Sequence, residues 1–188
     1  MERYESLESA RLAFSAGSKK LATIGFFDGV HCGHQLLLQD LKKWAGQAGA
    51  EPVVVTFRAH PQAVLGSHPP VPVVSLEHRL LLLERAGISA TVVLDFDEEL
   101  RALSPEDFVR DILVDGLGVE GLQMGFDSAF GSRRKGTFEY LEARQEELGL
   151  EVRRSQAELA GEAAVSSTRV REAVANWDFS ELDILLGH

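Results

Sequence analysis

The sequence predicts an α/β fold in which an open parallel sheet carries helices on both faces, in a single domain spanning residues 1–188. Short apolar, β-branched segments alternate along the chain with longer segments of helical periodicity, and repeated strand–helix–strand units produce this pattern. No internal repeat, low-complexity tract or interdomain linker interrupts the alternation. A length of 188 residues also suits one domain with a substantial core.

Apolar runs and helix start signals predict the individual elements. Strands are expected over residues 20–25, 52–57, 90–96 and 119–125, and from residue 151. Helices are expected near 34–47, 76–86, 105–114, 137–148, 166–175 and 180–186, and a loop rich in Pro, His and Gly over 58–72. Ser104 before Pro105 is a good helix start, because serine caps free N–H groups and proline suits the first helical position.

The order of these elements also predicts where a ligand binds. In open parallel sheets, ligands lie beyond the carboxyl ends of the strands. We therefore expect the loops after the first, second and fourth predicted strands to converge on one cleft, together with the turn at 166–171.

Composition excludes several classes of protein. Hydrophobic residues make up 45% and charged residues 26%, a mixture typical of globular proteins. The net charge of −10 argues against nucleic acid as a partner, because nucleic-acid binding needs a basic face. No apolar run has the length of a membrane span and the acidic start is unlike a signal peptide. The single cysteine, Cys32, excludes an internal disulfide and fits a reducing cytoplasm.

The most informative segment is GFFDGVHCGH at residues 25–34, between the first predicted strand and the helix that follows it. Its three glycines allow a tight turn and a close approach to a ligand. His31 and His34 are three residues apart, so both side chains can point the same way at the first helical turn. A helix N-terminus attracts anions. The segment therefore predicts a site for the phosphates of a nucleotide.

Two other roles are open to the histidines. Zinc binding would need a third ligand and a general base between the histidines, and Cys32 and Gly33 provide no such base. Alternatively, the imidazoles could simply cap the helix. Cys32 occupies a variable position of the motif, so we expect no nucleophilic role for it.

The HxGH pattern is shared by a superfamily of nucleotidyltransferases. The longer string GxFDGVHxGH closely resembles the N-terminal adenylyltransferase domain of the bacterial FAD synthetases (bifunctional riboflavin kinase/FMN adenylyltransferase). The resemblance covers about residues 20–187. It includes the TFRAHP segment at 56–61, the glycine-bounded segment 125–136 and SSTRVR at 166–171. It implies a Rossmann-like fold of the HxGH nucleotidyltransferase type.

The resemblance implies transfer of AMP from ATP to the phosphate of FMN, which gives FAD and pyrophosphate. Mg²⁺ is expected to be held mainly by the ATP phosphates, with no protein metal site. His31, His34 and Arg171 are the expected catalytic residues. The residues expected to bind ATP or its phosphates are Gly25, Phe26, Phe27, Asp28, Gly33, Arg133, Ser166, Ser167 and Thr168, with Asp28 mainly shaping the turn. Those expected to bind the flavin are Phe57, His60, Pro61, Asp127 and Phe130.

Some features depart from the family pattern. Phe26 stands where the family often has Asn, Ser128 replaces a usual phenylalanine and Ala129 a longer side chain. Two alternatives therefore remain: an HxGH transferase with another phosphorylated acceptor, and a flavin- or nucleotide-binding module without turnover. The family also continues into a β-barrel riboflavin kinase domain. Because this sequence stops at His188, we expect it not to phosphorylate riboflavin.

Overall fold

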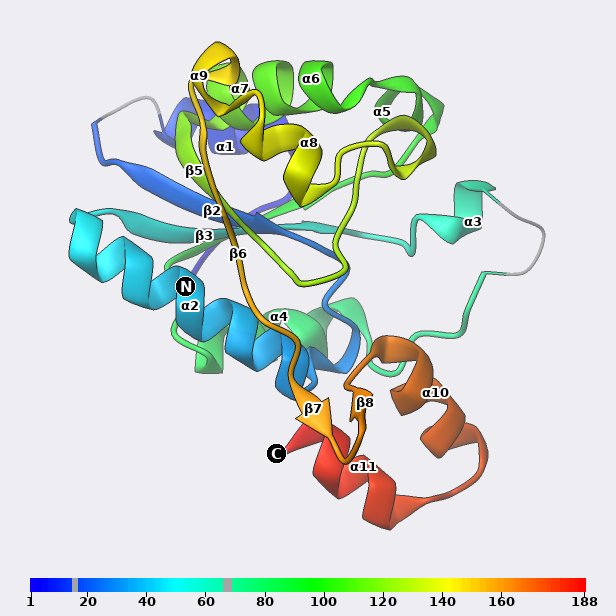
Figure 1. The fold of residues 1–188 in the computed structure, drawn as a ribbon. Helices are drawn as coiled ribbons and strands as arrows, with labels where there is room; N and C mark the ends of the chain where they lie inside the picture. The colour runs from blue at the N-terminus through cyan, green and yellow to red at the C-terminus, as the bar shows by residue number, and fades with distance from the viewer. Residues whose placement is uncertain (15–16, 66–68) are drawn as a thin grey trace.

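A computed structural model describes residues 1–14, 17–65 and 69–188. Among these residues, six strands form one parallel sheet in the order β1-β4-β3-β2-β5-β6 (Figure 1). They are β1 (Glu2–Tyr4), β2 (Lys20–Ile24), β3 (Glu51–Phe57), β4 (Ala90–Leu94), β5 (Val119–Met124) and β6 (Glu151–Arg154). A separate antiparallel pair is formed by β7 (Leu159–Ala160) and β8 (Ala163–Ala164). The predicted parallel α/β fold is confirmed.

Strand β2 lies where the strand order reverses. The chain proceeds from β2 to β3 and β4 on one side, and then returns to β5 and β6 on the other. Two neighbouring connections that leave a sheet in opposite directions open a crevice at the carboxyl ends of their strands. The segment 25–34 follows β2 directly, so it lies at this point of the sheet.

Helices cover both faces of the sheet (Figure 1). They are α1 (Leu7–Phe14), α2 (Cys32–Ala48), α3 (Gln62–Leu65), α4 (Leu76–Arg85), α5 (Glu98–Ala102), α6 (Pro105–Asp107), α7 (Asp115–Leu117), α8 (Phe138–Glu142), α9 (Gln145–Leu148), α10 (Ser167–Ala175) and α11 (Phe179–Leu186). Short 3₁₀ turns form η1 (Asp28–Val30) and η3 (Ser132–Arg134), and wide π-type turns, η2 (Phe108–Val114), join α6 to α7.

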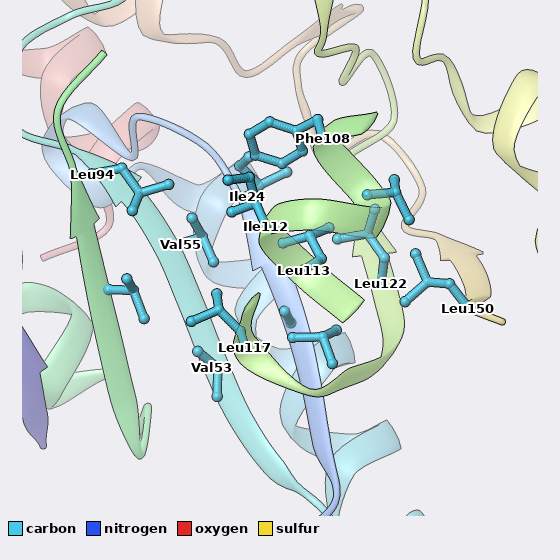
Figure 2. Packing of buried hydrophobic residues seen from close by; sticks show 14 of the residues in the cluster. Ile24, Val53, Val55, Leu94, Phe108, Ile112, Leu113, Leu117, Leu122 and Leu150 are labelled. Carbon is cyan, nitrogen blue, oxygen red and sulfur yellow. The ribbon is translucent and has the colours of Figure 1, made fainter. Parts of the chain in front are cut away.

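Alternate residues of the central strands divide between two apolar clusters, as the twofold period of a strand requires. On β3, Val53 and Val55 face a cluster formed with α1, η2, α8 and α9, whereas Val54 faces α2 and α4. Figure 2 shows the first cluster, in which Phe108 and Leu113 pack over the strands. Both faces are buried, which accounts for the nearly continuous apolar runs in these strands.

Several boundaries differ from the predictions. Helix α2 begins two residues early, since His31 itself caps it. The helix predicted over 105–114 continues to Leu117 through η2 and α7. The helix predicted over 137–148 is interrupted at Arg144, whose backbone leaves the helical region (φ −122°). The predicted loop 58–72 contains the short helix α3, and its residues 66–68 lie outside the described residues.

Sequence analysis also did not predict β1, α1, α5, β7 and β8. Strand β1 is a three-residue edge strand whose residues are exposed or half-buried, so it carries no apolar alternation. It is held by backbone pairing to β4. Helix α1 buries only Ala10, and α5 buries no residue. Elements with so little apolar burial leave little periodicity for sequence reasoning to detect.

Leu41 on α2 is fully buried against the sheet. We predict that Leu41→Ala lowers the free energy of unfolding by about 2–5 kcal/mol, because it removes apolar contacts and leaves a cavity. Urea unfolding followed by circular dichroism measures the change. Leu81→Ala, at a partly exposed position of α4, is the matched control and should cost far less. Equal effects of the two substitutions would contradict this account of the core.

Candidate functional site

The segment 25–34 forms a tight, unusual turn between β2 and α2. Phe27 (φ 57°), Gly29 (φ 67°) and Val30 (φ 43°) all adopt left-handed backbone conformations. Such conformations are strained for a β-branched residue such as Val30. The Phe27 ring is buried in the core beneath the turn. Gly25 provides the space, because a Cβ at residue 25 would lie 3.1 Å from that ring.

His31 links two helix N-termini. Its Nδ1 accepts the backbone N–H of His34 at 3.3 Å and so caps α2. Its Nε2 lies 3.2 Å from the Oγ of Ser167, the first residue of α10. Because Nδ1 is an acceptor, we assign the proton of the neutral ring to Nε2. The imidazole therefore directs an N–H donor toward the junction of the two helices.

His34 stacks on His31, with ring centroids 3.6 Å apart and planes 18° from parallel. Phe27 lies against its other side, 5.0 Å between centroids. Its Nδ1 is buried and has no hydrogen-bond partner among the described residues. A buried polar atom of this kind is costly unless a ligand or water satisfies it.

Both imidazoles are held neutral. Burial, reinforced by the positive charge of Arg171, lowers the pKa of His31 to about 4. Burial, together with the neighbouring His31, lowers the pKa of His34 well below its ordinary value. Near pH 7 the pair therefore offers uncharged N–H donors rather than two cations.

Asp28 forms hydrogen bonds that join the motif turn to residues 73–74 and to α10. Its side chain is only 2% exposed. One carboxylate oxygen accepts the backbone N–H groups of Val73 and Val74, at 2.9 and 3.4 Å. The other accepts a hydrogen bond from Nη1 of Arg171 at 3.2 Å. Arg171 is brought toward the motif in this way, and its side chain is 24% exposed.

The segment 166–171 opens α10 directly beside the motif. Ser166 caps the helix by accepting the N–H of Arg169 at 3.3 Å. Gly33 lies at this junction, where a Cβ would be in contact with the Val165 carbonyl oxygen at 3.4 Å. Thr168 lies on the exposed side of the first turn. The convergence expected between the two signature segments is therefore present in the structure.

A cavity of about 140 Å³ opens where these segments meet. Its lining comes from the motif histidines, the loop after β5, the loop after β6 and the start of α10. The lining residues are His31, Gly33, His34, Leu37, 125–128, 155–158 and 164–167. Asp127 is thus brought to the same cavity as the histidines. The loop after β6 was missed by sequence analysis, although its position after a parallel strand was a usable signal.

A second cavity, of about 300 Å³, lies between the ends of β2 and β3 and the start of α4. Phe26, Arg58, residues 72–76 and Arg79 line it. The loop after β3, which was expected to join the same cleft as the motif histidines, has its two ends at this cavity instead. Arg79 is 2% exposed and donates to the carbonyl oxygens of Phe26 and Phe57, each at 2.7 Å. Its guanidinium also stacks over the Phe26 ring. Burial lowers the pKa of Arg79 to about 10.

Sequence analysis did not single out Arg79. On the helical pattern of α4, an arginine is expected to be solvent-exposed. In the structure, the Arg79 guanidinium instead donates hydrogen bonds to carbonyl oxygens at the carboxyl ends of β2 and β3. The sequence alone does not reveal this contact. Arg79 lies one turn from the Ser75 cap of α4, and nothing about that position in the sequence indicates that its side chain is buried.

The residues assigned to the flavin are distributed more widely than those of the motif. The Phe57 ring packs in the core against Phe96, and Phe130 packs against Phe108. His60 contacts the Phe26 ring edge-on, with centroids 4.7 Å apart. Pro61, beside it, is half-buried.

The basic segment after β5 carries Arg133, whose expected contact with phosphates stays a prediction. Arg133 is exposed and does not line either of the two cavities described above. Its neighbour Arg134 donates to the Asp127 carbonyl oxygen at 3.3 Å. It is therefore Arg134, and not Arg133, that forms a hydrogen bond to the 125–128 loop.

The described residues contain no group of three or more His, Cys, Asp or Glu side chains that could hold a metal ion. Asp28, the buried carboxylate nearest the histidines in sequence, already uses both oxygens. In the same part of the chain, no helix is both long and apolar enough to cross a membrane.

The fold and the site together define a nucleotidyltransferase-like α/β protein. Residues 14–169 match the FAD synthetase family model. The bifunctional riboflavin kinase/FMN adenylyltransferase of Pseudomonas fluorescens is 38% identical over 167 residues, covering 89% of this chain and 54% of that protein. The chain belongs to the FAD synthetase family. It spans about half the length of the curated relatives it matches.

Solved structures show the same architecture. A structure titled macrolide-efflux protein, from Streptococcus pneumoniae, superposes with a TM-score of 0.83 at 25% identity, covering 99% of this chain and 61% of that one. A pantoate-beta-alanine ligase from Francisella tularensis superposes with a TM-score of 0.63 at 10% identity, covering 98% and 78%. The ligase likeness concerns the fold alone.

The lowered pKa of His31 predicts a stability change with pH. The unfolded chain takes up a proton near pH 6.5, whereas folded His31 does so near pH 4. The contribution of neutral His31 is therefore complete above pH 6.5 and is lost progressively as pH falls toward 4. When the pH is lowered from 7.5 to 5, protonation of His31 alone should lower the free energy of unfolding by about 2 kcal/mol.

Urea unfolding at both pH values measures this loss. His31→Asn keeps a side chain that can cap α2 but does not titrate, so the loss should shrink. His78→Gln, on the exposed side of α4, is the control and should leave the loss unchanged. An unchanged pH dependence in His31→Asn would contradict the assignment.

Proposed function

We propose that this chain transfers the AMP group of ATP to the phosphate of FMN, producing FAD and pyrophosphate. Family membership supports this reaction class, and the names of the relatives support FMN as acceptor. One observation carries the proposal. The stacked, neutral His31 and His34 rings lie beside Ser167, where the N-termini of α2 and α10 come together. Two helix N-termini and uncharged N–H donors suit a polyphosphate.

The proposed chemistry needs no covalent intermediate. A phosphate oxygen of FMN forms a bond to the α-phosphorus of ATP, and the bond from that phosphorus to the bridging oxygen breaks, releasing pyrophosphate. A phosphate monoester has a second pKa of about 6, so near neutral pH the nucleophile is already largely an oxyanion. The protein must align the two groups and stabilise the developing charge.

Each side chain has a defined part in this proposal. His31 donates from Nε2, and His34 supplies the second imidazole, to phosphate oxygens in the cavity beside them. The Ser167 hydroxyl lies at the same point. Arg171 does not itself line that cavity, but the donors that its hydrogen bond to Asp28 leaves free would extend to phosphates at its edge. These local donors offset the repulsion expected from a net charge of −10.

Mg²⁺ belongs to this proposal as part of the Mg–ATP substrate. Magnesium bound to nucleotide phosphates keeps several water ligands and needs few protein carboxylates. We further propose that residues 1–188 act as one adenylyltransferase unit in the cytoplasm and do not phosphorylate riboflavin.

The direct test incubates the purified chain with Mg–ATP and FMN and follows FAD by chromatography, with riboflavin as a parallel substrate. FAD from FMN, and neither FMN nor FAD from riboflavin, is the expected result. Binding of ATP with no FAD formed would refute the FMN adenylyltransferase proposal and favour another acceptor or a binding module.

The histidines provide the mechanistic test. We predict that His31→Ala and His34→Ala each lower kcat about 100-fold or more, because each removes a donor to charge that develops in the transition state. Steady-state rates are measured alongside circular dichroism spectra to establish folding. His78→Ala, on the exposed side of α4, is the control and should keep the full rate. Near-normal turnover in a well-folded double variant would remove the pair from the mechanism.

A further inference from the structure

The C-terminal end of α11 contacts the motif turn at three points. The Sγ of Cys32 lies 3.5 Å from the carbonyl oxygen of Ile184. The side-chain amide of Gln35 donates to the carbonyl oxygen of Leu186 at 2.6 Å. A ring nitrogen of His188 lies 3.1 Å from the Gly29 carbonyl oxygen. Segments more than 150 residues apart in sequence are therefore joined beside the histidine pair.

Packing reinforces these polar contacts. A Cβ at Gly29 would lie 3.3 Å from the Leu186 side chain and 3.4 Å from that of Val73, so the turn and the end of α11 are closely packed. Leu186 also belongs to the apolar cluster that joins α11 to α10 through Val170 and Leu185. The end of α11 is thus held between the motif turn and the helix that carries Arg171.

Gln35 is the branch point of this junction. Its Nε2 donates both to Leu186 and to the carbonyl oxygen of Val30, the latter at 3.0 Å. Val30 is the strained residue with φ 43° that directly precedes His31. The backbone N–H of Gln35 in turn donates to the His31 carbonyl oxygen at 2.9 Å. One side chain therefore connects the strained turn, the first turn of α2 and the end of α11.

We propose that Gln35 is a positioning residue for the adenylyl transfer: by holding Val30 against the end of α11, it fixes the direction of the His31 imidazole. This inference rests on the proposed function. A strained turn persists only while its surroundings hold it in place, and both hydrogens of the Gln35 amide are used for that purpose. The placement of α11 then becomes part of the catalytic geometry.

The proposed role predicts a particular kinetic signature. A donor displaced by about 1 Å from the reacting phosphate can cost about 100-fold in rate. Nucleotide affinity, in contrast, is spread over a cavity lined by several loops. Loss of the Gln35 donors should therefore lower kcat much more than it raises the KM for ATP.

Three substitutions separate hydrogen-bond donation from side-chain shape. Gln35→Glu has nearly the same shape but, when ionised, no donor, and Gln35→Leu has neither donor nor charge. Both should lower kcat about 10- to 100-fold with the KM for ATP changed less than about threefold. Gln35→Lys keeps donors that can reach both carbonyl oxygens and should retain most of the rate.

Gln39 provides the matched control, because it lies one turn further along α2 and is exposed. Gln39→Glu adds the same charge, and Gln39→Leu the same apolar group, and both should leave kcat unchanged. Circular dichroism and thermal unfolding establish that each variant folds. If Gln35→Leu does not fold, the kcat of Gln35→Glu is compared with that of Gln35→Lys instead.

Hydrogen exchange gives a readout that does not depend on turnover. We expect faster amide exchange over residues 26–33 in Gln35→Glu and Gln35→Leu, and unchanged exchange over the second half of α2. Rates within twofold of wild type for both variants, or unchanged exchange in the turn, would overturn the positioning role. If the wild-type chain makes no FAD at all, the proposed function fails, and the exchange measurement alone decides whether Gln35 holds the turn.

Discussion

The pair of interactions made by the His31 imidazole is the constraint on which the site depends. One ring nitrogen caps α2 and the other meets Ser167 at the start of α10. The two residues are 136 positions apart in sequence, so one ring contacts both signature segments, beside the Asp28–Arg171 ion pair that also joins them. Replacing the ring would disturb the cap and the approach of α10 together.

The same geometry supports the proposal that this acidic chain binds a polyphosphate. Buried imidazoles with lowered pKa values contribute directed N–H donors without the cost of burying charge. Positive potential instead comes from the N-termini of α2 and α10 and from Arg171. Asp28 is the counter-ion of Arg171: it holds the guanidinium in place and neutralises part of its charge. Among the described residues, the lining of the cavity itself includes Asp127 and Glu158 and no Lys or Arg side chain, so an anion bound there would meet directed N–H donors and helix N-termini rather than cations.

Local patterns predicted the sheet and the meeting of the two signature segments well. Runs such as Val53–Val55 are buried on both faces, and a Cβ at Gly25 or Gly33 would lie 3.1 or 3.3 Å from a neighbouring side chain. Contacts between distant segments were not predictable. The buried position of Arg79, the loop 155–158 in the cavity and the branch point at Gln35 depend on tertiary packing. Arg133, expected at the phosphates because of its charge, is exposed and lies outside both cavities.

The central claim is that His31 is a neutral imidazole with its proton on Nε2. Long-range ¹H–¹⁵N NMR of protein labelled at histidine measures the tautomer and the charge of the ring directly, with His31→Asn used to assign the signal. We predict an Nε2–H tautomer that persists from pH 7.5 down to pH 6, since the pKa of His31 is lowered to about 4. A protonated imidazolium at pH 6, or a proton on Nδ1, would contradict the account.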